Sequence, residues 1–126
     1  LQVVAAIRYV TTGAYLDCIQ EYENMPVAPE LEGLQNRLKS MASKYAACVT
    51  QITEAKDQEL LDFCARRLVE MAAHIIMGHL MVQDASKSDL FSESAQVYVR
   101  YAEAEVEKHI NFIRKFDKDD LAYYRK

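Results

Sequence analysis

The stretch from Met71 to Val82 is apolar on every side of a helix, except at two histidines. A helix at the edge of a globular domain needs one apolar stripe, whereas a helix that is apolar all round must be covered by several neighbours. The stretch is also too short to cross a bilayer, which takes about 20 residues. The sequence therefore predicts a buried central helix with the rest of the chain packed around it.

Apolar residues recur at steps of three and four along four segments, as they do on one face of an α-helix. We expect these helices at residues 1–22, 29–52, 57–82 and 89–113. Asp57 is a suitable N-cap for the third helix, because its carboxylate accepts hydrogen bonds from the first turn. In the fourth helix the pattern predicts inward-facing side chains at Phe91, Ala95, Tyr98, Val99, Ala102, Val106, Ile110 and Ile113.

The loops between these segments are short, and short loops make consecutive helices antiparallel. The sequence therefore predicts an all-α fold, an up-down-up-down antiparallel four-helix bundle. We interpret residues 1–126 as a single helical-bundle domain. Because Leu1 already stands inside a helical pattern, with no start methionine or capping residue, we interpret the domain as a piece of a larger chain.

Charge and cysteine usage limit the partners and the compartment. The net charge of −4 gives no general attraction to nucleic acid or anionic lipid, so we expect neither a nucleic-acid nor a membrane partner. Cys18, Cys48 and Cys64 stand singly among apolar helical residues, which argues against a disulfide framework. No secretory signal opens the chain, and we expect a cytoplasmic protein.

Histidines and glutamates provide the only candidates for a metal or haem site. Glu70 with His74, and Glu105 with His109, are four residues apart, whereas a di-iron bundle uses pairs three apart together with further inward carboxylates. Helical i,i+4 pairs at the surface are the simpler interpretation. His74 and His79 point about 140° apart, so they do not ligate one haem together. We expect His79 to be a buried, satisfied histidine and His74 to lie on the outer side.

Catalytic and phosphate-binding motifs are missing. The three glycines form no glycine-rich loop that cradles phosphate. A catalytic cysteine–histidine pair stays open as an alternative, although all three cysteines occupy positions of small core residues. We predict no catalytic, cofactor-binding or metal-binding residue in this chain.

Two stretches carry a family resemblance: residues 61–82, LDFCARRLVEMAAHIIMGHLMV, and residues 101–116, YAEAEVEKHINFIRKF. They resemble the extra C-terminal helical domain found in a subset of acyl-CoA dehydrogenase-like flavoproteins, where it follows the core that binds FAD and acyl-CoA. The resemblance spans most of the chain. It implies that residues 1–126 are the C-terminal part of such an enzyme.

The resemblance implies a parent enzyme that oxidises the Cα–Cβ bond of acyl-CoA thioesters with FAD as hydride acceptor and a glutamate base. None of that machinery matches residues here, so FAD is expected in the parent chain and no cofactor in this fragment, which we expect to be inactive alone. The resemblance thus points to a non-catalytic domain serving core packing or oligomerisation. Two alternatives stay open: an independent helical protein-interaction module, and a bundle that holds a cofactor.

A candidate interface lies on the outer side of the third helix. There Ala73, Met77 and Met81 continue the apolar surface, with His74 at its rim. Contiguous exposed apolar surface usually marks a contact site. We expect these residues to pack against the upstream acyl-CoA dehydrogenase core or a second copy of the domain. The alternative is that Tyr123 and Tyr124 of the C-terminal tail fold back over them.

Overall fold

The computed structural model describes residues 2–115, with side chains from residue 6 onward. Over this part of the chain there are five α-helices, two 3-10 turns and no strand. The prediction of an all-α fold is confirmed. The elements are α1 (Gln2–Thr11), α2 (Ala14–Glu23), η1 (Pro29–Leu31), α3 (Glu32–Glu54), α4 (Gln58–Lys87), η2 (Asp89–Phe91) and α5 (Ser92–Lys115).

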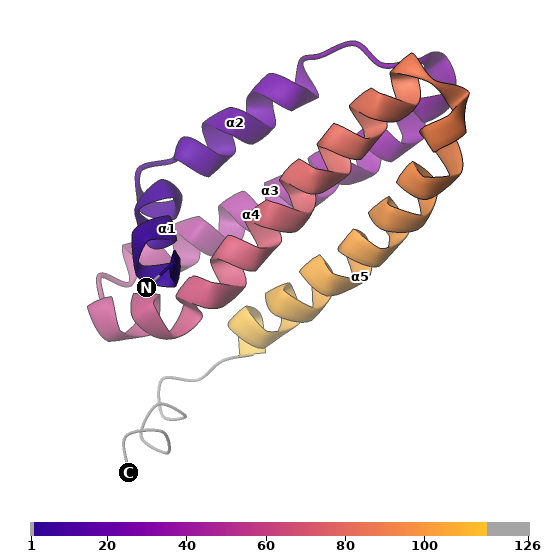
Figure 1. Ribbon diagram of the computed structural model, residues 1–126. Helices are drawn as coiled ribbons and strands as arrows, with labels where there is room; N and C mark the ends of the chain where they lie inside the picture. Colours follow the sequence, from indigo (N-terminus) through magenta and orange to yellow (C-terminus); the bar gives the residue numbers. More distant parts are fainter. Residues whose placement is uncertain (1, 116–126) are drawn as a thin grey trace.

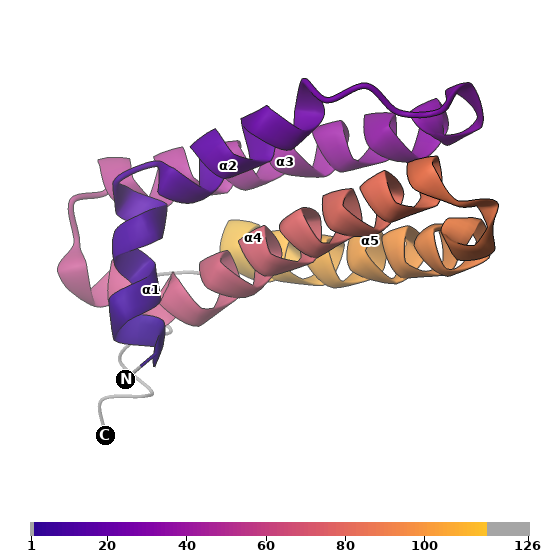
Figure 2. The same cartoon turned by 45° about the horizontal axis from the view of Figure 1, so that its top comes forward.

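The three long helices α3, α4 and α5 pack against one another, and each runs antiparallel to the one before it (Figure 1). The shorter α2 packs along α3 and α4. Helix α1 is turned across the end of the molecule where α3 leads into α4 (Figure 2). The observed arrangement therefore differs from the predicted four-helix bundle in having a separate fifth helix.

A break at Gly13 creates this fifth helix, so the prediction of one continuous helix over residues 1–22 is wrong. Gly13 has a φ of 81°, in the left-handed region that side-chain-bearing residues rarely adopt. The bend lets both Val10 on α1 and Ile19 on α2 be buried in the same core. An apolar pattern that continues past a glycine does not show whether the backbone continues straight.

Helix α4 is the centre of the fold, as the apolar stretch predicts, because it contacts each of the other four helices. Leu68, Met71, Ala72 and Ile75 are fully buried along it. A Cβ atom added at Gly78 would lie 2.6 Å from Leu38 Cδ2 on α3, so the glycine permits close packing of these two helices.

The predicted start of α4 is confirmed, but its predicted end is not. Asp57 caps its start, since the carboxylate accepts hydrogen bonds from Glu59 N at 3.1 Å and Leu60 N at 3.2 Å. The predicted loop after Val82 is wrong, because the helix continues to Lys87 and buries Ala85 in the core. The extra turn is stabilised by that burial.

The core stripe of α5 is nearly as predicted. Six of the eight expected inward positions are buried: Ala95, Val99, Ala102, Val106, Ile110 and Ile113. Tyr98 is half-buried at the edge of α4, and Phe91 is exposed. Phe91 was misplaced because it belongs to the 3-10 turn η2, before α5 begins at Ser92, and its side chain remains exposed.

Candidate functional site

The four residues of the predicted interface lie along one side of α4 but differ in exposure. Ala73 is exposed and the Met77 side chain is 47% exposed. His74 and Met81 are half-buried, and Met81 packs against the core. The apolar surface on α4 is therefore smaller than expected at Met81, and the exposed Leu80 extends it.

This surface continues onto α5 through a groove of about 600 Å³. Met81 forms the α4 wall of the groove, while η2 and α5 contribute large exposed side chains. Leu90 is 80% exposed, Val97 58% and Tyr101 52%. Glu93, Ser94 and Tyr98 complete the lining. The residues on α5 were missed from sequence, although their spacing of three and four residues was a readable signal.

An aromatic cluster joins α4 to α5 beside the groove. The Tyr98 hydroxyl lies 3.0 Å from Nδ1 of His74, and the Tyr101 ring meets the His74 ring edge to face at 5.6 Å. Burial raises the pKa of Tyr98 above its usual value. His74 is thus fixed by neighbours on α5 rather than by Glu70 on its own helix.

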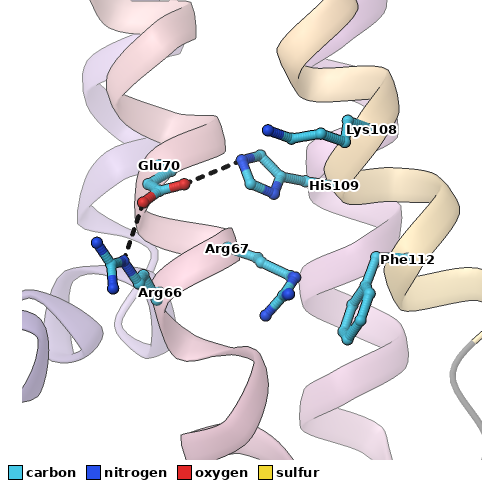
Figure 3. Close-up of a pocket in the computed structure, with 6 residues that line it drawn as sticks. All are labelled: Arg66, Arg67, Glu70, Lys108, His109 and Phe112. Carbon is cyan, nitrogen blue, oxygen red and sulfur yellow. Dashed lines mark hydrogen bonds and ion pairs between the residues drawn. The ribbon is translucent and has the colours of Figure 1, made fainter.

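A second pocket, of about 570 Å³, lies between α4 and the later part of α5 (Figure 3). It is lined by Arg66, Arg67, Glu70, Lys108, His109 and Phe112. The Arg67 guanidinium lies 3.5 Å from the centroid of the Phe112 ring, a cation–π contact. The lining carries charge but includes neither a hydroxyl nor a thiol nucleophile.

Ion pairs neutralise most of this charge. Glu70 accepts from Arg66 Nε at 3.1 Å and lies 3.0 Å from His109 Nε2, so it joins α4 to α5. Lys108 pairs with Glu105 at 2.7 Å. Burial lowers the pKa of His109, although Glu70 opposes that shift. Neither predicted i,i+4 pair is seen. Glu70 pairs with Arg66 and not with His74, and Glu105 pairs with Lys108 and not with His109. The residues that line the pocket therefore hold α4 and α5 together through polar and cation–π contacts.

The buried histidine and the cysteines do not form a reactive pair. His79 is 1% exposed, as expected, but its Nε2 has no hydrogen-bond partner within residues 2–115, so the prediction that it is satisfied is wrong. Burial raises the pKa of the Cys48 and Cys64 thiols, which keeps them protonated and poorly nucleophilic. All three cysteines are free, and Cys18 is half-buried.

Residues 2–115 offer neither a cluster suited to a metal ion nor a loop suited to the phosphates of a flavin. Within the described chain, no three His, Cys, Asp or Glu side chains converge. Gly13 lies at a bend, Gly33 in the first turns of α3, and Gly78 against Leu38, so they do not form one phosphate-binding loop. No helix in residues 2–115 is both long and apolar enough to span a bilayer.

Comparison with protein families identifies the family to which this helical chain belongs. A family model described as acyl-CoA dehydrogenase C terminal matches residues 11–121. This chain belongs to that family. The resemblance noted in residues 61–82 and 101–116 is confirmed. A comparison with curated proteins finds no match.

A solved structure is similar to this domain over almost its full length. The crystal structure of the acyl-CoA dehydrogenase family protein from Porphyromonas gingivalis is 48% identical in sequence. The match covers 90% of this chain and 98% of that chain, with a TM-score of 0.86. The helical arrangement described above is therefore shared with this acyl-CoA dehydrogenase family protein.

Proposed function

We propose that this member of the acyl-CoA dehydrogenase C-terminal family is a non-catalytic contact domain. It serves to pack against the dehydrogenase core or to build the oligomer, in an enzyme that oxidises acyl-CoA thioesters with FAD in the cytoplasm. The flavin and the catalytic base are assigned to the rest of that enzyme, as the family resemblance implies.

The single observation that supports the proposal is the continuous apolar surface on α4 and α5. We call it the outer face and define it by Met77, Met81, Leu90, Val97 and Tyr101. Four of these five side chains are among the large exposed apolar residues. Burying one such side chain is worth roughly 1.5–3 kcal/mol, so a partner that covers the outer face gains substantial free energy.

The outer face differs in polarity from the surface between α3 and α5. Between α3 and α5 the surface carries charged side chains instead, including the ion pairs of Arg37 with Glu103 and Lys44 with Glu107. Contiguous apolar surface on a domain of this size is typical of a contact site. The predicted interface of Ala73, His74, Met77 and Met81 is thus one edge of the proposed surface.

Glutamate substitutions on the outer face test the proposal. Met77→Glu combined with Val97→Glu changes two exposed side chains on different helices, so we expect the fold to persist. In sedimentation velocity, self-association or binding to the separately expressed dehydrogenase core should be lost. Met25→Glu, at an exposed methionine outside the outer face, is the matched control. Association that is equal in all three proteins would refute the proposal.

The alternative of an independent helical interaction module uses the same surface. It is distinguished by the partner: binding to an unrelated protein, with no affinity for either the dehydrogenase core or a second copy, would favour it. The proposed alternative in which Tyr123 and Tyr124 cover the surface falls on residues outside the described part of the chain.

A further inference from the structure

Helix α5 carries two apolar stripes, of which only one is used within the chain. Its core stripe is buried against α3 and α4. A second stripe begins in η2 and continues along the opposite side at alternating steps of four and three, through Leu90, Ser94, Val97, Tyr101 and Ala104, all exposed. Alternating steps of four and three are what a helix presents to another helix. The outer stripe therefore suits a helical partner.

The two flanks of the outer stripe differ. On the α4 side lie Phe91 and Tyr98, the latter in contact with His74. Glu93, Arg100 and Glu107 are spaced seven residues apart along the other flank. Glu107 pairs with Lys44 of α3 at 2.6 Å, Arg100 lines a pocket with Arg37 of α3, and Glu93 borders the groove. Glu93 and Arg100 have no ion-pair partner among residues 2–115. These two opposite charges, seven residues apart, remain available to a partner.

We propose that the domain pairs with a second copy of itself through α5, the two helices running antiparallel, so that Glu93 of each copy faces Arg100 of the other. This rests on the proposed function and names its partner. Around a two-fold axis, Leu90 meets the second copy's Tyr101, and Ser94 meets the second copy's Val97. The same register sets Phe91 beside the second copy's Tyr98, toward α4.

Charge complementarity selects this arrangement. In the antiparallel register both unpaired charges are satisfied, and they are satisfied twice because the two-fold axis repeats each pair. A parallel pairing would set Ser94 against Ser94 and Tyr101 against Tyr101, and it would leave Glu93 beside Tyr98 without a cation. The antiparallel register also places a small residue opposite a larger one at the centre, which favours close packing of the helices.

Charge reversal tests the proposal with the full chain. Glu93→Arg and Arg100→Glu each turn two attractive pairs of the homodimer into two repulsive pairs, so self-association should weaken about tenfold or more. When the two variants are mixed, one copy carries two arginines and the other two glutamates at these positions. Both cross-pairs are then opposite in charge, and the mixture should associate as well as wild type.

Sedimentation equilibrium over a concentration series measures both effects, and circular dichroism checks that each variant is folded. Glu54→Arg, at an exposed position near the end of α3, makes the same change in charge as Glu93→Arg but away from α5, and it should leave association unchanged. Two folded single variants that associate as wild type would overturn the proposal, and so would a mixture that fails to recover. A weakening by Arg100→Glu alone would overturn the antiparallel register.

The charge-reversal test of the antiparallel pairing can fail independently of the glutamate test of the proposed function. Loss of association by the outer-face glutamates, with no effect of charge reversal, would overturn the antiparallel pairing and leave the contact-domain proposal standing. If neither set of variants changes association with the dehydrogenase core or with a second copy, both proposals fail.

Discussion

His79 should make the domain less stable as the pH falls below 6.5. The side chain is buried between α2 and α4, where its ring stacks on Tyr22 with centroids 5.9 Å apart. Burial lowers the pKa of His79 to about 4, and the positive charge of Lys39 adds to the shift. In the unfolded chain the imidazole has its ordinary pKa of about 6.5.

The sign and magnitude follow from proton linkage. Between pH 6.5 and pH 4 the unfolded state binds a proton at His79 that the folded state does not bind, so acid favours unfolding. One pKa unit corresponds to about 1.4 kcal/mol, and the loss in the free energy of unfolding from pH 7 to pH 5 is therefore about 2 kcal/mol. The loss is complete once the pH falls below the folded pKa.

Replacing His79 by leucine should remove this pH dependence. The substitution keeps the volume similar and eliminates the unpartnered Nε2. Urea unfolding at pH 7 and pH 5 gives the free energies of both proteins, and carboxylates common to the two cancel in the comparison. We expect the wild type to lose about 2 kcal/mol more than His79→Leu. Equal losses would show that His79 is solvated or partnered in the folded state, which would refute the reasoning.

Three further outcomes are expected. Gly13→Ala should lower the free energy of unfolding by about 1 kcal/mol, since alanine is strained at positive φ, and Gly13→Asn should cost less; equal melting temperatures for the two would contradict this. Asp57→Ala should cost about 1 kcal/mol through loss of the α4 cap, whereas Asp57→Ser should retain most of it, as urea unfolding would show. Calorimetric titration of the chain with FAD or a medium-chain acyl-CoA should give no heat of binding, and micromolar affinity would reveal a site that the described residues do not suggest.

Local chemistry predicted much of the fold. The apolar stretch around Met71 identified the central helix, and the cap at Asp57 identified its start. The break at Gly13 could not be read, because apolar spacing continues on both sides of it. The extra turn of α4 was missed because Asp84 and Ser86 look like loop residues, whereas the burial of Ala85 is a tertiary effect.

The candidate site was predicted less completely, for a geometric reason. A single sequence shows which residues share one helix face but not how two helices are rotated about their axes. The pairing of Glu70 with His109 and the contact of His74 with Tyr98 both depend on that rotation. The α5 side of the outer face was readable as a second stripe through Val97, but Tyr98 was assigned to the core pattern.

Methionine methyl resonances test most directly whether the outer face is a contact surface. The chain has five methionines, and labelling their methyl carbons allows each environment to be followed by NMR. Met77 and Met81 lie on the outer face, Met41 and Met71 are buried in the core, and Met25 is exposed elsewhere. On raising the concentration or adding the dehydrogenase core, the signals of Met77 and Met81 should shift while the other three stay in place. Association that leaves Met77 and Met81 unchanged, or that shifts Met25 instead, would contradict the account.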